Sequence, residues 1–126
     1  MSKNVVQTAA APAAIGPYSQ AIRVGNAVYT SGQIGLVPAT GELAGADLET
    51  QARQAFANLA AVAEAAGATL AQAVKFTLYL TDLEGFAQVN AIMAELVPAP
   101  FPARSTVGVA SLPKGALFEV DAILVV

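Results

Sequence analysis

An arginine in an apolar, proline-rich stretch is the first candidate for chemistry in this chain. Arg104 lies within residues 101–107, FPARSTV, where the prolines stiffen the backbone. A guanidinium presents a planar fork of N–H donors that matches a carboxylate. Arg104 therefore indicates either a contact to a ligand carboxylate or a structural ion pair with an acidic side chain, and the sequence leaves both interpretations open.

A carboxylate in a late apolar segment is the second candidate. In residues 117–123, LFEVDAI, Glu119 and Asp121 alternate with apolar side chains, so the two acids share one face of a predicted strand. Burying a carboxylate is costly, and burial raises its pKa toward the range that suits general acid–base catalysis. The alternative is that this face is open to solvent on an edge strand.

Other polar residues have weaker signals of their own. Tyr18 follows a Gly-Pro turn, and Ser31 precedes Gly32 inside a strand pattern, where a glycine indicates a close approach to the backbone. Asn90 lies in a helical pattern. Lys75 is predicted to serve packing or the surface, and nothing supports it as a Schiff-base lysine.

The chain contains no cysteine and no histidine, and this excludes several classes of site. Disulfides, thiol nucleophiles and histidine-based hydrolase mechanisms are excluded. Zinc, copper and non-haem iron sites draw on the same two residue types, and the carboxylates are too dispersed for a magnesium or calcium site. We therefore expect neither a metal nor a cofactor.

The charge content is low for a soluble protein. Of the 126 residues, 56% are hydrophobic and 12% are charged, whereas about 25% are charged on average. Alanine accounts for part of this excess, and we expect buried subunit interface to account for the rest. The net charge of −3, with six scattered basic residues, argues against a nucleic-acid partner.

No segment has the roughly 20 consecutive apolar residues that span a bilayer. The small-residue stretch at residues 9–14 follows only one lysine and two polar residues, which makes it a poor signal peptide. We therefore expect no membrane association and a cytoplasmic location.

The elements that must position these residues follow from hydrophobic periodicity. Residues 20–24 and 27–34 predict a hairpin around Gly25-Asn26, and residues 35–46 predict a loop. Asp47 predicts the N-cap of a helix that ends at Gly67.

The second half repeats this strand–helix order. Residues 73–81 predict a strand, and Asp82 predicts the cap of a helix that runs to about residue 97, where three prolines follow. Residues 107–109 begin an extended segment, residues 111–115 form a turn, and residues 117–126 predict a final strand. We expect one domain over residues 1–126, of the α+β class, with a mixed β-sheet and two helices packed on one face.

Together these segments resemble the RidA family of reactive-intermediate deaminases, also called YjgF-like proteins. The matches follow one another along nearly the whole chain. They are AIGPYSQ at 14–20, YTSGQI at 29–34, YLTDL at 79–83, VN at 89–90, FPARSTV at 101–107, LPK at 112–114 and FEV at 118–120.

The resemblance implies a chorismate-mutase-like fold, a homotrimer and an active site in each cleft between subunits. It implies hydrolytic deamination of enamines and imines, of the 2-aminoacrylate and 2-aminocrotonate type, to 2-keto acids and ammonia, in the manner of a 2-iminobutanoate/2-iminopropanoate deaminase. Arg104 matches the residue that holds the substrate carboxylate, and Glu119 matches the one that orients the attacking water. The expected substrate-binding residues are Arg104, Tyr18, Ser31, Gly32, Asn90 and Thr106.

Position 106 departs from the pattern, since many members carry cysteine where this chain has Thr106. Two other functions stay open at this point. The same pocket could bind a small carboxylate without catalysis and regulate a partner. RNA cleavage has been attached to relatives of the family, and the acidic chain without histidine argues against it.

Overall fold

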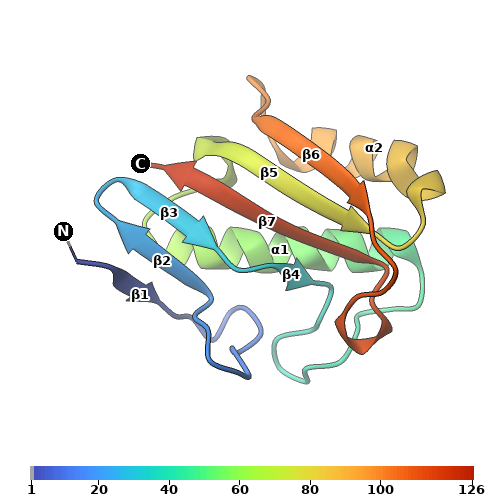
Figure 1. Ribbon diagram of the computed structural model, residues 1–126, viewed down its shortest axis with the longest axis horizontal. Coiled ribbons are helices and arrows are strands. Elements are labelled where there is room, and N and C mark those ends of the chain that lie inside the picture. The colour runs from blue at the N-terminus through green and yellow to red at the C-terminus, as the bar shows by residue number, and fades with distance from the viewer. Residues whose placement is uncertain (1) are drawn as a thin grey trace.

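The computed structural model describes residues 2–126 and is built on one seven-stranded sheet with two helices behind it (Figure 1). The strands are β1 (Asn4–Val6), β2 (Ala21–Val24), β3 (Ala27–Thr30), β4 (Gln33–Ile34), β5 (Ala73–Leu80), β6 (Ala103–Gly108) and β7 (Phe118–Val125). The α-helices are α1 (Leu48–Ala65) and α2 (Phe86–Leu96), and short 3₁₀ turns lie at Leu70–Gln72, Leu83–Gly85 and Pro113–Gly115.

The strand order is β1-β2-β3-β7-β5-β6, with β4 also paired to β7. β5 and β6 pair in parallel across the α2 crossover, whereas β3 and β5 each pair antiparallel with β7. The predicted mixed sheet with two helices on one face is therefore confirmed, and β7 lies at the centre of it.

α1 forms as its sequence predicts. The Asp47 carboxylate accepts a hydrogen bond from the backbone N–H of Thr50 at 2.9 Å and so caps the helix. Its apolar stripe is buried against the sheet, and the Phe56 ring lies 6.1 Å from that of Phe76 and 5.5 Å from that of Phe118. Gly67 ends the segment with a φ of 82°, a conformation that favours glycine.

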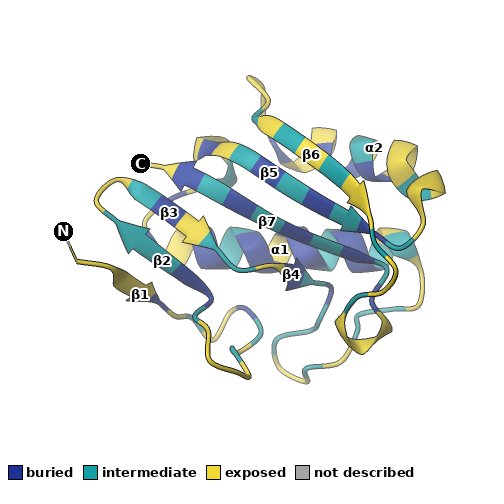
Figure 2. Cartoon of the chain, viewed as in Figure 1, coloured by how far each residue is buried: buried dark blue, intermediate teal, exposed yellow. Residues whose placement is uncertain are grey.

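The opposite face of the sheet has no helix over it, and this face is turned toward the viewer in Figure 2. Buried and half-buried residues alternate along β5 and β7, because successive side chains point to opposite faces (Figure 2). The predicted two-residue alternation of the last strand is confirmed. Exposed apolar side chains such as Val5 and Tyr29 lie on this uncovered face, together with the polar residues of β5 and β7.

Two predicted boundaries in the second half are wrong. Asp82 caps the 3₁₀ turn Leu83–Gly85, its carboxylate accepting from the N–H of Glu84, and α2 begins only at Phe86. The extended segment begins at Ala103 instead of residue 107, because the parallel ladder with β5 starts there.

Two features of the first half were not predicted. β1 is a short edge strand whose three residues give little periodicity. The second strand of the hairpin is interrupted after Thr30 and resumes at Gln33, so that the predicted strand 27–34 is two strands, β3 and β4.

Candidate active site

The break between β3 and β4 is a local departure of the backbone from the sheet. The pairing of β3 with β7 ends at Tyr29, whereas the N–H of Ser31 still donates to the carbonyl of Gln20, beside the start of β2, at 2.9 Å. The backbone N–H of Ala122 in β7 then donates to the side-chain Oγ1 of Thr30 at 2.9 Å, in place of a ladder bond. Such irregularities occur beside active sites, where they redirect side chains.

Gly32 lies in this break directly against Glu119. A Cβ on Gly32 would overlap Oε2 of Glu119 and lie 2.6 Å from its Cδ. The absence of a side chain at position 32 therefore makes room for the carboxylate. The glycine signal in the sequence, a close approach to the backbone, is explained by this contact.

Glu119 is half-buried on the uncovered face of β7, opposite Ile34 of β4 and Tyr79 of β5. Burial raises the pKa of Glu119, and the negative charge of Asp121 on the same face raises it further. The Tyr79 hydroxyl donates to Oδ2 of Asp121 at 2.8 Å. Burial and then this bond raise the pKa of Tyr79 to about 12, so the phenol keeps its proton at neutral pH.

A pocket of about 280 Å³ contains Glu119, Gly32 and Tyr18, which are three of the predicted site residues. Lys114 and Pro113 form part of its wall, and the Lys114 ammonium donates to the carbonyl of Gly41 at 3.0 Å. The remaining lining is largely apolar. A carboxylate with a raised pKa therefore faces a small, mainly apolar space.

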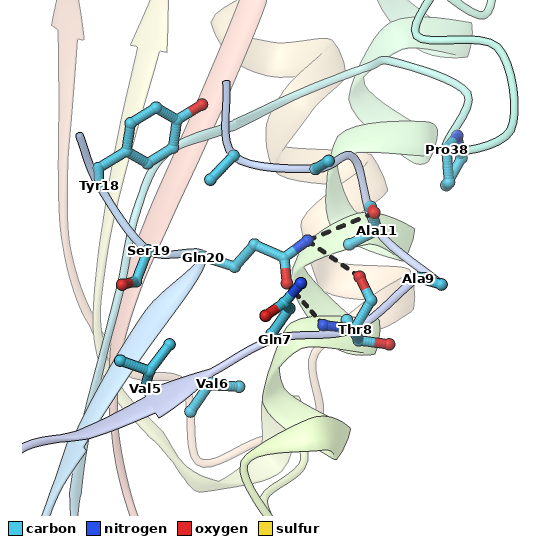
Figure 3. Close-up of a pocket in the computed structure, with 12 residues that line it drawn as sticks. Val5, Val6, Gln7, Thr8, Ala9, Ala11, Tyr18, Ser19, Gln20 and Pro38 are labelled. Carbon is cyan, nitrogen blue, oxygen red and sulfur yellow. Dashed lines mark hydrogen bonds between the residues drawn. The ribbon is translucent and has the colours of Figure 1, made fainter. Parts of the chain in front are cut away.

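The segment that carries Tyr18 is held by Gln20 and Ser31. The Gln20 amide donates to the carbonyl of Thr8 at 3.1 Å and accepts from the N–H of Thr8 at 2.7 Å (Figure 3). It also donates to the carbonyl of Pro12 at 2.7 Å. The hydroxyl of Ser31 donates to the carbonyl of Ser19. Ser31, a predicted pocket residue, thus positions the loop that carries Tyr18.

An adjoining pocket of about 580 Å³ lies between this loop and β1 (Figure 3). It shares Tyr18 and Gln20 with the Glu119 pocket, and all of its lining residues are uncharged. A charged substrate therefore finds no ionic partner in its lining.

Arg104 lies on the other face of the sheet. It pairs in register with Phe76, whose side chain is buried beneath the helices, and paired residues share a face. Its guanidinium lies 5.3 Å from the centre of the Phe86 ring and 3.7 Å from Sδ of Met93, both on α2. The face of the Phe86 ring and the sulfur atom of Met93 thus hold the guanidinium in place.

The hydrogen-bond donors of Arg104 have no acidic partner within residues 2–126. Arg53, in contrast, forms ion pairs with Glu49 at 3.1 Å and with Glu95 at 2.7 Å. The interpretation of Arg104 as half of a structural ion pair is therefore wrong for the single chain. A pocket of about 320 Å³ brings Arg104 together with Asn90, another predicted site residue.

Thr106 lies two residues beyond Arg104 on the same face of β6, opposite the buried Leu78. Its Oγ1 is buried and makes no hydrogen bond to any group of the described chain. Such groups are uncommon, because burial of an unpaired hydroxyl is costly. In the described part of the chain, a hydroxyl without a hydrogen bond therefore lies on the same strand face as a guanidinium without an acidic partner.

The predicted residues form two separate groups. The first, called the carboxylate group, is Tyr18, Gly32 and Glu119. The second, called the guanidinium group, is Asn90, Arg104 and Thr106. β7 and β6 are two strand spacings apart, or about 10 Å, and Glu119 and Arg104 pair with β5 residues about 10 Å apart along that strand. A ligand of a few carbon atoms cannot contact both groups of one chain.

Two buried polar residues of α1 near these groups, Gln51 and Asn58, were not predicted from the sequence. Gln51 and Asn58 are buried in α1 and bind the backbone near β4 and β7, yet they fall on the apolar stripe at 51, 55, 58 and 62. A polar residue within that stripe was the signal. On α2, Val89, Ile92 and Met93 are buried, whereas Phe86 and Leu96 at its two ends are exposed.

Residues 2–126 contain no group of three acidic side chains close enough to hold a metal ion, in a chain without histidine or cysteine. Within the same range, no helix is long and apolar enough to cross a membrane.

Comparison with known proteins gives a family match over most of the chain. Residues 8–126 match the family model described as endoribonuclease L-PSP. A protein of Dermatophagoides farinae named 2-iminobutanoate/2-iminopropanoate deaminase is 47% identical over 98% of this chain and 97% of its own length.

Solved structures share the fold throughout. RidA from an Antarctic Psychrobacter is 48% identical, with a TM-score of 0.95 over 98% of this chain and 99% of that one. TdcF from E. coli, solved with bound serine, is 42% identical, with a TM-score of 0.90 over 98% of both chains. The expected fold is therefore confirmed.

We predict that Asp121→Asn lowers the pKa of Glu119 and leaves it above its ordinary value. The substitution removes one negative charge and keeps the acceptor for Tyr79, while burial, the larger cause, remains. The measurement is a pH titration of the ¹³Cδ resonance of Glu119, assigned by its loss in Glu119→Gln. An unchanged or higher pKa in Asp121→Asn would contradict this electrostatic description.

Proposed function

The chain belongs to the endoribonuclease L-PSP family, which includes the RidA proteins, and we propose that it deaminates reactive imines by hydrolysis. The substrates are 2-iminobutanoate, 2-iminopropanoate and their enamine forms, 2-aminocrotonate and 2-aminoacrylate, and the products are the 2-keto acids and ammonia. The name of the 47% identical relative supports this activity.

The observation that carries the proposal is a guanidinium with no acidic partner among residues 2–126, together with a carboxyl group of raised pKa. Arg104 binds the substrate carboxylate through its fork of N–H donors. Asn90 and Thr106, beside it, orient the bound molecule. The carboxylate of Glu119 sits against Gly32 and faces the reacting carbon with a water molecule.

The reaction needs one base and one acid in sequence. Glu119 accepts a proton from water while the water oxygen forms a bond to the iminium carbon. Protonated Glu119 then gives that proton to the nitrogen of the tetrahedral carbinolamine. The C–N bond breaks, the released ammonia takes up the hydroxyl proton as ammonium, and the 2-keto acid remains. An iminium carbon is already electrophilic, so positioning and proton transfer supply the catalysis.

The two groups of residues act together only between two chains. We therefore extend the proposal to a homotrimer in which the carboxylate group of one subunit faces the guanidinium group of the next. β6, which carries Arg104, is an edge strand and is accessible to a neighbour. The uncovered sheet face supports the assembly, because a largely apolar row crosses it at Val5, Ile22, Tyr29, Ile123, Lys75 and Ala103.

Binding without turnover is the alternative function, and the TdcF structure with bound serine is the observation that favours it. The same two groups would then hold a small amino or keto acid and signal its presence. RNA cleavage is not proposed, although the family description names it. The chain carries a net charge of −3 and has no histidine, so it lacks both a basic surface and the usual base for that reaction.

The trimer gives a testable mass. Light scattering should give a mass near three times the 12.7 kDa of one chain. Tyr29→Glu, in the uncovered apolar row, should lower the mass because it buries a charge in the interface. Ala57→Glu, on the exposed surface of α1, is the matched control and should leave it unchanged. A parent mass near 12.7 kDa would contradict the shared site.

The two central side chains should fail in different ways. Arg104→Ala should weaken 2-keto acid binding by about 10- to 100-fold, since a charge-assisted contact is lost, and Arg104→Lys should restore part of it. Glu119→Gln should keep that binding and lower turnover by about 10²- to 10⁴-fold, because an amide cannot act as the base.

Calorimetry with 2-ketobutyrate and initial rates of ammonia release from 2-aminoacrylate generated in situ separate these effects. A parent protein that binds the keto acid and gives no rate above the uncatalysed one is a binding module. Full turnover by Glu119→Gln would show that another group activates the water.

A further inference from the structure

The face of α1 that lies against β4 is polar and buried. Gln51 is 2% exposed and Asn58 is 1% exposed, among apolar neighbours on the same helix. Burying an amide is costly unless its donors and acceptor are satisfied. Both side chains form hydrogen bonds to backbone groups in the segments next to the carboxylate group.

Asn58 holds the backbone of β4 from the helix side. Its Nδ2 donates to the carbonyl of Leu36 at 2.8 Å and to that of Ile34 at 3.2 Å. Its Oδ1 accepts from Nε2 of Gln54 at 2.9 Å, so both ends of the buried amide have hydrogen-bond partners. One side chain therefore ties the two carbonyls on either side of Gly35 to α1.

The contact between this segment and α1 is close. A Cβ on Gly35 would overlap the carbonyl oxygen of Gln51 and lie 2.7 Å from its Cα. β4 itself has only two residues, which pair with Val120 and Glu119 of β7. Two ladder pairs fix a strand weakly, so the contacts with α1 decide where β4 lies.

The position of β4 sets the surroundings of the Glu119 carboxylate. Ile34, whose carbonyl Asn58 binds, is directly opposite Glu119 in the ladder. Gly32, two residues earlier, lies against the carboxylate itself.

A second amide of α1, that of Gln51, binds the backbone next to β7. Oε1 of Gln51 accepts from the N–H of Leu117 at 2.8 Å, just before β7, and its Nε2 donates to the carbonyl of Gly45 at 2.8 Å. α1 thus binds both the β4 segment that pairs with Glu119 and the residue just before β7, the strand that carries Glu119.

We propose that Asn58 is a positioning residue for catalysis, which acts through Ile34 and Gly32 to hold the pocket wall against Glu119. The expected effect of Asn58 on turnover rests on the proposed deamination. Replacing Asn58 with an apolar residue of similar size fills the same space and releases both carbonyls. β4 then withdraws from Glu119, and the carboxylate becomes more solvated and loses its fixed direction.

Asn58→Leu is the test, with Gln54→Leu as the matched control. The control removes the bond to Oδ1 of Asn58 and keeps both bonds to the carbonyls of Ile34 and Leu36. Asn58→Leu should lower the pKa of Glu119, seen in the ¹³Cδ titration, because burial is the main cause that raises it. Turnover should fall by about 10- to 100-fold, as for small misplacements of catalytic groups, with keto acid affinity unchanged. Gln54→Leu should change none of the three.

A lower melting temperature with an unchanged Glu119 pKa and unchanged turnover would overturn the proposal and leave Asn58 a purely structural residue. The pKa measurement needs no turnover, so it decides the positioning claim even if the parent protein proves inactive. Should Asn58→Leu fail to fold, Asn58→Ser, which keeps one donor, decides by the same readouts. A smaller decrease in the pKa supports the proposal, and no decrease overturns it.

Discussion

Side chains that pair directly across neighbouring strands lie on the same face of a sheet, and this constraint separates the two halves of the site. Arg104 shares a face with the buried Phe76, and Glu119 shares the opposite face with Tyr79. Neither residue can be brought to the other by a change of rotamer, because the sheet lies between them. Within residues 2–126 each half is therefore incomplete alone: Arg104 has no acidic partner on its face, and Glu119, with its raised pKa, has no cation paired to it on the other.

α1 has two functions in this arrangement. Its apolar side chains close the core against the sheet, with Phe56 at the centre. Its two buried amides reach past the core to the backbone on each side of Glu119. The geometry of the carboxylate therefore depends on the helix as much as on the sheet. Buried polar groups with all partners satisfied are suited to this, since they specify one arrangement where apolar contacts tolerate several.

The sequence predicted the elements whose residues repeat with a clear period. α1 with its Asp47 cap, β5 and the alternating β7 are confirmed, and the Gly32 signal corresponds to a real close approach. The break at Ser31 was not predicted, because it depends on contacts with other strands. The N–H of Ser31 donates to the carbonyl of Gln20, and the side-chain hydroxyl of Thr30 accepts from the N–H of Ala122 in place of a backbone ladder bond. The start of β6 was misplaced for a similar reason, since pairing with β5 extends a proline-bounded segment that has little periodicity of its own.

The sequence motifs identified the candidate residues. They did not indicate that these residues lie on two opposite faces of the sheet. The alternation placed Glu119 and Asp121 together, but no periodicity in residues 101–107 indicated which face Arg104 takes, because that depends on the register with β5. Asn58 and Gln51 were not predicted to be buried, because apolar residues alone define the buried face of a predicted helix. The resemblance to the RidA family supplied the roles that residue types alone left open.

The most direct test of the shared site is complementation between two variants that each lack one of the two side chains. Arg104→Ala subunits keep Glu119, and Glu119→Gln subunits keep Arg104, so a cleft between one of each contains both side chains. Equal amounts of the two variants, unfolded and refolded together, should regain up to about one quarter of the parental deaminase activity, as random assortment around a closed ring allows. The control is the same pair refolded separately and then mixed. Activity of the co-refolded sample that stays at the sum of the two variants would contradict a site made from two chains.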